Sequence, residues 1–218
     1  MQVQQDQDIK GFSLLELLVV IAIVGLVSAV GYPNFSKWNK ERKVRSGMEN
    51  IFSQMNKLVS QTQSGNYPYV KYEIDCSDLP CKFTSKGMKK ETFSKAIYEK
   101  KIKLDCSDRI SWDNSKINIF EGDDIATHFI SEKGGVCFSQ NGKYYSTVGK
   151  IDKNENLTIE GSDRKNWIVI CSKDDFKDTK VCPGKGSFKK KEIVYLISWS
   201  RFGSISKYKW DGNEWVRR

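Results

Sequence analysis

A single carboxylate lies inside the most apolar stretch of this sequence. Glu16 is the only acidic or basic residue between Phe12 and Asn34, and a long aliphatic run surrounds it. A charged side chain at the centre of a bilayer costs about 2.5–3.5 kcal/mol on insertion scales. A carboxylate at this position therefore needs a specific role, and the elements before and after it have to place it where that role can be carried out.

A polar leader, residues 1–10, precedes the apolar run, with Gly11 at the junction. A secretory signal has its small-residue cleavage site after the apolar centre. Here the small residue comes first, so the apolar run is expected to remain in the mature protein. From Phe12 to Tyr32 the run is long enough to span a bilayer, which takes about 20 residues.

An amphipathic helix is predicted to follow. Pro33 removes a backbone donor and predicts a kink. Ser64-Gly65, with Pro68 just beyond, predicts the end of the helix. Between them, apolar residues recur at spacings of three and four, as on a helix with one buried stripe. These residues are Phe35, Trp38, Val44, Met48, Ile51, Phe52, Met55, Leu58 and Val59.

The remaining residues, 65–218, predict a domain of antiparallel strands with a short basic helix at Lys89–Lys103. Tyr67–Ile74 is predicted as an edge strand, because Pro68 cannot donate a hydrogen bond. Asn166–Ser172 and Glu192–Ser200 are the most apolar runs and predict central strands. Further strands are predicted at Lys116–Phe120, Gly135–Ser139, Lys143–Val148, Thr158–Ile159, Ile205–Trp210 and Glu214–Val216, with hairpin turns at Asn141-Gly142 and Asp211-Gly212-Asn213.

Six cysteines follow the apolar run: Cys76, Cys81, Cys106, Cys137, Cys171 and Cys182. An even number beyond a membrane segment indicates an oxidising compartment and up to three disulfides. Six cysteines allow 15 pairings. Short loops favour Cys76–Cys81 and Cys171–Cys182, which leaves Cys106–Cys137; buried thiols are the alternative.

No catalytic set is apparent. His128 is the only histidine, and no C-x-x-C pair is present. Asp123-Asp124 and Asp174-Asp175 lack the pattern of a calcium loop. We therefore expect no enzymatic activity, no metal and no cofactor.

The net charge is +9, with a pI of about 9.1. This balance fits either a dispersed basic surface or affinity for nucleic acid. Aromatic and basic residues gather near the C-terminus, where rings stack on bases and cations track phosphates in nucleic-acid binding proteins. A sheet with core aromatics and exposed lysines is the alternative. The candidate DNA contacts are Arg201, Lys207, Lys209, Arg217 and Arg218.

The run Gly11-Phe12-Ser13-Leu14-Leu15-Glu16, followed by apolar residues, resembles the signal of type IV prepilins and of type II secretion pseudopilins. The resemblance covers about residues 10–45, and Pro33 falls where this family commonly has a helix-kinking proline. It implies a pilin-like α+β fold, with a long N-terminal helix packed on an antiparallel β-sheet domain. The implied segments are a cleaved leader (1–11), a transmembrane or filament-core helix (12–32), an amphipathic helix extension (33–64) and an exported, disulfide-containing domain (65–218).

The resemblance also implies how the chain is processed. A prepilin peptidase would cut between Gly11 and Phe12, and Phe12 would be N-methylated. Glu16 would pair with the N-terminal amine of a neighbouring subunit, relieving both charges in lipid. A plain signal anchor, in which Glu16 only reaches toward the interface, is the alternative.

The implied partners are the peptidase, other pilins or pseudopilins, and the bacterial inner membrane. The N-terminus would be cytoplasmic and the C-terminal domain periplasmic until the subunit enters a filament at the cell surface. The length and the number of cysteines favour a minor pilin. A secretion pseudopilin is an alternative, as is a minor pilin that binds DNA, because Glu192–Trp210 is similar to the C-terminal part of H-type pseudopilins and DNA-binding minor pilins.

Overall fold

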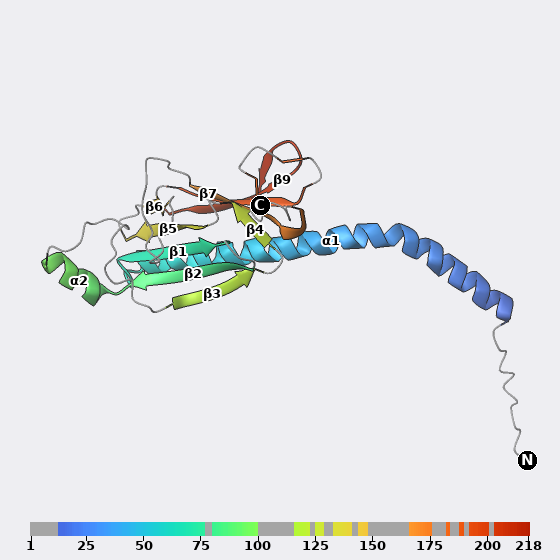
Figure 1. The fold of residues 1–218 in the computed structure, drawn as a ribbon, viewed down its shortest axis with the longest axis horizontal. Coiled ribbons are helices and arrows are strands. Elements are labelled where there is room, and N and C mark those ends of the chain that lie inside the picture. Colours follow the sequence, from blue (N-terminus) through green and yellow to red (C-terminus); the bar gives the residue numbers. More distant parts are fainter. Residues whose placement is uncertain are drawn as a thin grey trace, which may run out of the picture. The chain divides into compact units, whose positions relative to one another are not determined.

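One long helix, α1 (Leu14–Gln63), is continuous across two units of the chain, Met1–Lys40 and Glu41–Arg218 (Figure 1). The computed structural model describes residues 13–76, 80–99, 116–122, 125–128, 133–140, 144–147, 166–175, 182–183, 188–189, 192–200 and 203–218. We call Glu41–Arg218 the globular unit. Its boundary at Lys40 lies inside the predicted helix extension.

Local sequence determines both ends of α1. At its start, the Ser13 Oγ accepts a hydrogen bond of 3.2 Å from the backbone N–H of Glu16, as an N-cap residue does. At its end, Gly65 adopts a φ of +74°, and its N–H donates to the Thr62 carbonyl at 3.0 Å. A left-handed glycine in this position is a common helix C-terminus, because it carries no Cβ to clash. The end predicted at Ser64-Gly65 is confirmed.

Within the described residues, the globular unit contains two five-stranded sheets, in which all neighbouring strands are antiparallel. We call them sheet A, with the order β3-β2-β1-β5-β6, and sheet B, with the order β10-β9-β8-β7-β4. The strands are β1 (Tyr69–Asp75), β2 (Cys81–Met88), β3 (Lys116–Gly122), β4 (Ile125–His128), β5 (Lys133–Ser139), β6 (Tyr144–Thr147), β7 (Trp167–Ser172), β8 (Val194–Trp199), β9 (Ile205–Trp210) and β10 (Trp215–Arg217); helix α2 (Lys90–Tyr98) follows β2, and the 3-10 turn Lys173–Asp175 follows β7.

The C-terminal half of α1 and the inner faces of both sheets share one core. Met48 and Ile51 of the helix are at most 1% exposed, as are Phe83 of sheet A and Ile197 of sheet B. Burying a side chain of this size contributes about 1.5–3 kcal/mol. This apolar stripe is what attaches both sheets to the helix.

The predicted stripe is wrong at its beginning. Phe35 and Trp38 are 61% and 54% exposed, whereas Val44 is 1% exposed. They precede Glu41, where the globular unit begins, so the buried stripe starts only at Val44.

The edge-strand prediction for Tyr67–Ile74 is also wrong. β1 pairs with β2 on one side and with β5 on the other, so it is central in sheet A. Pro68 lies just before the ladder, where its missing N–H is not needed. Its carbonyl accepts a hydrogen bond of 2.9 Å from the Gln140 N–H.

The other strand predictions that fall on described residues are confirmed within one to two residues at most ends. β7 and β8 are internal to sheet B, as predicted. β9 and β10 form a hairpin. In its turn, the Asp211 Oδ1 accepts hydrogen bonds of 2.8 Å from the N–H groups of Asn213 and Glu214. The turn at Asn141-Gly142 and the strand at Thr158–Ile159 lie outside the described residues.

The described disulfides are the two short bridges that loop closure favoured, Cys76–Cys81 and Cys171–Cys182. The first joins the end of β1 to the start of β2. Cys137 is also disulfide-bonded, and the predicted Cys106–Cys137 bridge involves Cys106, which lies outside the described residues. The described cysteines therefore agree with an oxidising compartment.

A largely buried ion cluster lies on the face of sheet A that points away from the shared core. Lys71 Nζ is 2.5 Å from Glu73 Oε1, and Lys86 Nζ is 2.8 Å from Glu73 Oε2. Burial alone would raise the pKa of the Glu73 carboxyl, but the two ammonium groups hold it below its ordinary value. Burial lowers the pKa of Lys71, and the attraction of Glu73 offsets only part of that effect.

We expect Glu73 to contribute to acid sensitivity. Because its folded pKa is lowered, its stabilisation is full above the unfolded value of about 4.3 and is lost as the pH falls through the folded pKa. Glu73→Gln should lower the free energy of unfolding at neutral pH by about 1.5–3 kcal/mol, the range for hydrogen bonds to charged groups, and flatten its acid limb. Urea unfolding across acid and neutral pH measures both effects. The exposed Glu91→Gln is the control, and an acid limb unchanged by Glu73→Gln contradicts the assignment.

Candidate assembly segment and C-terminal basic strands

The first turn of α1 contains the carboxylate singled out in the sequence. Glu16 is exposed, and Ser13 and Glu16 have the S-x-x-E spacing of a capping box, of which the hydrogen bond from the Glu16 N–H to Ser13 Oγ is present. A carboxylate in the first turn also interacts favourably with the helix dipole, typically by about 0.3–1 kcal/mol. Sequence reasoning missed this local role, although the spacing was visible.

The hydrogen bond to Ser13 uses the backbone N–H of Glu16 and not its carboxylate. The partner expected for the carboxylate from the sequence resemblance is the N-terminal amine of a neighbouring subunit. Gly11 and Phe12, the predicted cleavage and methylation residues, lie outside the described residues.

An apolar surface covers the helix on both sides of Glu16. The large aliphatic side chains exposed here range from 49% at Val19 to 78% at Leu14. An apolar surface of this extent marks a site of contact with a membrane or with other proteins.

Among the described residues, no single helix meets the length and hydropathy requirements of a membrane span. The bent pair Leu14–Ala29 and Asn34–Gln63 meets them together. The break between the two parts includes Pro33, and the kink assigned to Pro33 stays a prediction.

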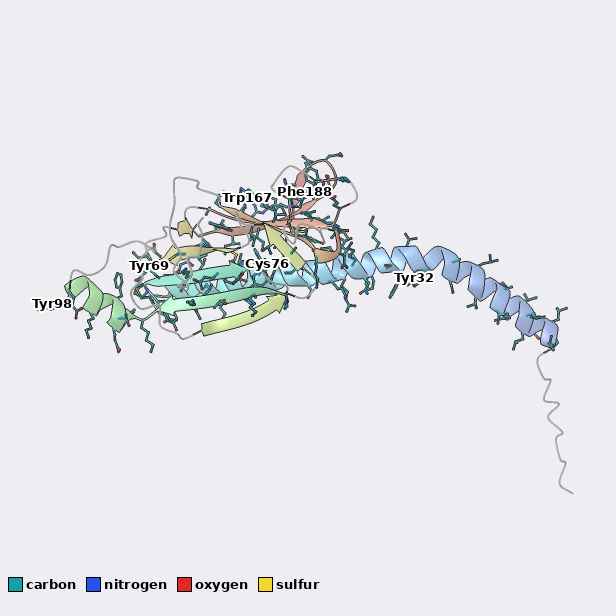
Figure 2. All side chains as sticks on the ribbon, in the orientation of Figure 1. Tyr32, Tyr69, Cys76, Tyr98, Trp167 and Phe188 are labelled. Carbon is teal, nitrogen blue, oxygen red and sulfur yellow. A yellow bond between two sulfur atoms is a disulfide. The ribbon has the colours of Figure 1, made fainter. Side chains whose placement is uncertain are left out.

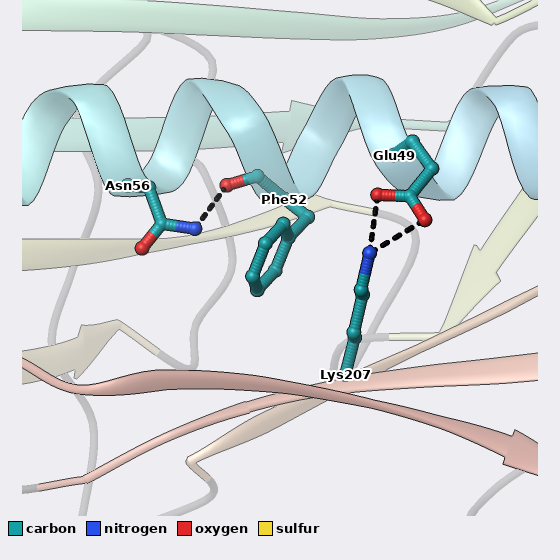
Figure 3. A network of polar contacts seen from close by, with 4 residues as sticks. All are labelled: Glu49, Phe52, Asn56 and Lys207. Atoms are coloured by element: carbon teal, nitrogen blue, oxygen red, sulfur yellow. Dashed lines mark hydrogen bonds and ion pairs between the residues drawn. The ribbon is translucent and has the colours of Figure 1, made fainter. Parts of the chain in front are cut away.

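Lys207 of β9, a candidate DNA contact, lies against α1 (Figure 3). Its Nζ donates to both carboxylate oxygens of Glu49, at 2.6 and 2.7 Å, and lies 4.9 Å from the centre of the Phe52 ring. One turn further along the helix, Asn56 Nδ2 donates to the Phe52 carbonyl at 3.0 Å. Lys207 therefore neutralises a helix carboxylate within the globular unit.

Lys209 forms a second contact of the same kind. It pairs with Glu41, whose Oε1 also accepts a hydrogen bond of 3.4 Å from the Tyr195 hydroxyl. Burial, with the nearby Glu41 charge, raises the pKa of Tyr195 to about 12. The phenol thus stays protonated and able to donate at physiological pH.

The aromatic residues of the hairpin lie on the other face of sheet B, since strand residues alternate. Trp210 and Trp215 are 5.4 Å apart between ring centres, and Phe188 lies 6.2 and 5.8 Å from them. These rings pack on a small apolar cluster that includes the Cys171–Cys182 bridge. Their tilted packing is that of a core cluster rather than of parallel stacking surfaces.

The remaining candidate DNA contacts are Arg217 and Arg218, both exposed. The Arg218 N–H donates to the Lys207 carbonyl at 3.0 Å, which holds the C-terminus beside β9. Arg201 and the side chain of His128 lie outside the described residues. Among the described residues, no group of three or more histidine, cysteine or acidic side chains is arranged to hold a metal ion.

Comparison with protein-family models matches residues 7–32 to the prokaryotic N-terminal methylation motif. The chain carries a type IV prepilin-like signal. The comparisons with curated proteins and with solved structures find no match. The matched residues contain Gly11, Phe12 and Glu16, on which the sequence resemblance was based.

The prepilin-like signal and the fold agree with each other. A long N-terminal helix followed by antiparallel sheets is an α+β arrangement consistent with the pilin-like fold. Together they support a type IV pilin-like or pseudopilin protein. The signal implies processing by a prepilin peptidase and assembly with other pilins.

We expect the ion pair between Lys207 and Glu49 to stabilise the globular unit modestly. Their side chains are 23% and 39% exposed, so solvent screens the pair, and a coupling of about 0.2–1 kcal/mol is expected. A double-mutant cycle of Lys207→Met and Glu49→Gln, read by urea unfolding, measures it. Lys95→Met with Glu49→Gln is the control cycle and should show no coupling; equal couplings in both cycles contradict a direct pair.

Proposed function

We propose that the protein is a minor structural subunit of a type IV pilus-like filament and has no enzymatic role. Prepilin peptidase cuts between Gly11 and Phe12, and Phe12 is N-methylated. The apolar helix then holds the subunit in the bacterial inner membrane, with the N-terminus cytoplasmic and the globular unit periplasmic. Extraction from the membrane places the subunit in a filament at the cell surface.

The methylation motif over residues 7–32 carries this proposal. The motif covers a helix surface of exposed aliphatic side chains, Leu14 to Val27, which favours contact with lipid or with other helices over contact with water. The same helix continues into a folded unit. This combination gives a subunit that stays in lipid until neighbouring helices replace the lipid.

Glu16 has the role of selecting the neighbour in this scheme. Cleavage creates a positive amine at Phe12, four residues before Glu16. In an apolar filament core, each charge alone is costly, whereas an amine and a carboxylate of adjacent subunits satisfy one another. A Cβ added at Gly25 would meet no atom of the subunit within 4 Å, so packing around Gly25 within the subunit does not require a glycine. We infer that Gly25 instead allows the helix of a neighbouring subunit to approach closely.

A type II secretion pseudopilin is the alternative filament subunit. The signal is shared by both systems, so it does not separate them. The length of 218 residues and the six cysteines favour a minor component over a major pilin. Neighbouring genes for a retraction ATPase and other pilins support the pilus, whereas genes for a secretion channel support the pseudopilin.

We expect Glu16→Gln to reduce incorporation into filaments by more than about tenfold, because leaving one member of a buried ion pair alone costs about 3–5 kcal/mol. Glutamine retains the capping-box function, so the variant isolates the charge. Immunoblots of sheared filaments, normalised to total subunit, give the measurement.

Leu18→Ala on the same helix is the control, and mass spectrometry checks that Phe12 is freed and methylated in each variant. Wild-type incorporation of a correctly processed Glu16→Gln protein contradicts the role assigned to Glu16.

DNA binding is a second candidate function, favoured by the exposure of Arg217 and Arg218 at the C-terminus. Lys207 and Lys209 would have to leave their helix carboxylates to take part. We therefore expect Arg217→Gln with Arg218→Gln to weaken binding by the globular unit and to reduce its salt dependence, whereas Lys207→Met should have the smaller effect. Mobility shifts of a DNA duplex at two salt concentrations test this. Absence of salt-dependent retardation by the wild-type unit removes the candidate.

A further inference from the structure

Three exposed aromatic side chains follow the apolar part of α1. Tyr32, Phe35 and Trp38 are 75%, 61% and 54% exposed. The rings of Phe35 and Trp38 contact each other, with centres 5.8 Å apart, and Tyr32 projects from the helix one turn earlier (Figure 2). All three belong to the unit Met1–Lys40, outside the core of the globular unit.

The order of residue types along this part of the helix is that of a membrane boundary. Aliphatic residues run to Val30, and the aromatic residues occupy 32–38. Lys37 lies among the aromatic residues and Lys40 just after them. At 1.5 Å per residue, Tyr32 and Trp38 are about 9 Å apart along the axis, comparable to the roughly 5–8 Å headgroup layer on each side of a bilayer. Tyrosine and tryptophan are enriched at this depth, where the ring meets acyl chains and the polar atom meets water.

We propose that Tyr32, Phe35 and Trp38, together with Lys37 and Lys40, form an interfacial anchor that binds phospholipid headgroups where the helix leaves the bilayer. The proposal rests on the membrane-held stage of the proposed function and adds a residue set that fixes the depth of the helix. The anchor holds the subunit at one depth before assembly, and extraction into a filament has to break it.

Charge favours lipid over a second copy of this chain as the occupant. A second copy aligned at the same level would bring its own Lys37 and Lys40 toward the first pair, and like charges repel. Headgroup phosphates instead present the opposite charge to these ammonium groups, an attraction of about 1 kcal/mol per basic residue near an anionic surface. The aromatic rings and the two lysines thus match one and the same layer.

Depth-dependent fluorescence quenching tests the anchor. The full chain is reconstituted in phosphatidylethanolamine–phosphatidylglycerol vesicles whose acyl chains carry bromine either near the headgroup or near the chain end. The Trp38 signal is the difference between the wild type and Trp38→Phe. We expect shallow bromine to quench it about twofold or more over deep bromine, because tryptophan prefers the headgroup level.

Trp167→Phe, in the globular unit, is the matched control and should leave the bromine-sensitive signal in place. A Trp38 signal insensitive to both lipids, in protein that floats with the vesicles, overturns the anchor but leaves the membrane stage of the proposed function intact. Protein that fails to float contradicts that stage itself. A Trp38 signal that changes with the protein-to-lipid ratio assigns the surface to a second copy and overturns the proposal.

The lysines have a separate test. Replacing phosphatidylglycerol with phosphatidylcholine should shift Trp38 of the wild type toward water and reduce shallow quenching, because the anionic partner is removed. Lys37→Gln with Lys40→Gln should abolish that lipid dependence. An equal dependence in the variant and the wild type overturns the role of the lysines.

Discussion

The burial of one stripe of α1 between two sheets is the interaction on which the globular unit depends. Val44, Met48, Ile51, Met55 and Leu58 repeat at spacings of three and four, and each is at most 2% exposed. The backbone of a helix is satisfied internally, so such an element can leave its core and enter a different environment without losing hydrogen bonds. Only its side chains must change, and in this chain they change from a single buried stripe to an apolar surface on every side.

The charges next to α1 follow the same division. Glu41 and Glu49 lie where the helix is in the globular unit, and each has a lysine of β9 as its partner. Glu16 lies where the side chains around it are apolar and exposed, and its described contact is the capping interaction of its own backbone with Ser13. The helix thus satisfies within the chain the carboxylates that stay in the globular unit. In the proposed filament, the one at its start pairs with the amine of another subunit.

The amino-acid sequence was sufficient for features that depend on local chemistry. The end of α1 follows from a glycine able to adopt positive φ, and the β9–β10 turn follows from Asp211 accepting two backbone hydrogen bonds. The strands β7 and β8 were recognisable because both of their faces are buried, so nearly all of their residues are apolar. β2 was not, because three of its four positions facing away from the core are polar, Lys82, Thr84 and Lys86. Phe83 alone carries a large side chain into the shared core.

Features that depend on residues far away in the sequence could not be predicted from the sequence alone. Pro68 suggested an edge strand, but only the position of β5 shows that the proline precedes the ladder. Lys207 and Lys209 looked like a basic surface, because nothing local shows that alternate residues of β9 face α1. Their partners lie more than 150 positions earlier, as the separations of 158 for Glu49 and 168 for Glu41 show.

These separations bear on how the subunit reaches its folded state. The ion pairs of α1 and much of sheet B come from the last 25 residues, including β9 and β10. Contacts across such long separations form late, since the loop-closure entropy must be offset before they contribute. A subunit threaded through a membrane with its N-terminal helix retained in lipid would therefore complete its core only after the C-terminus has crossed. In the proposed membrane-held stage, the apolar helix would hold one end of the chain in place during that interval. The same element that later joins the proposed filament would then also keep the unfinished domain at the membrane.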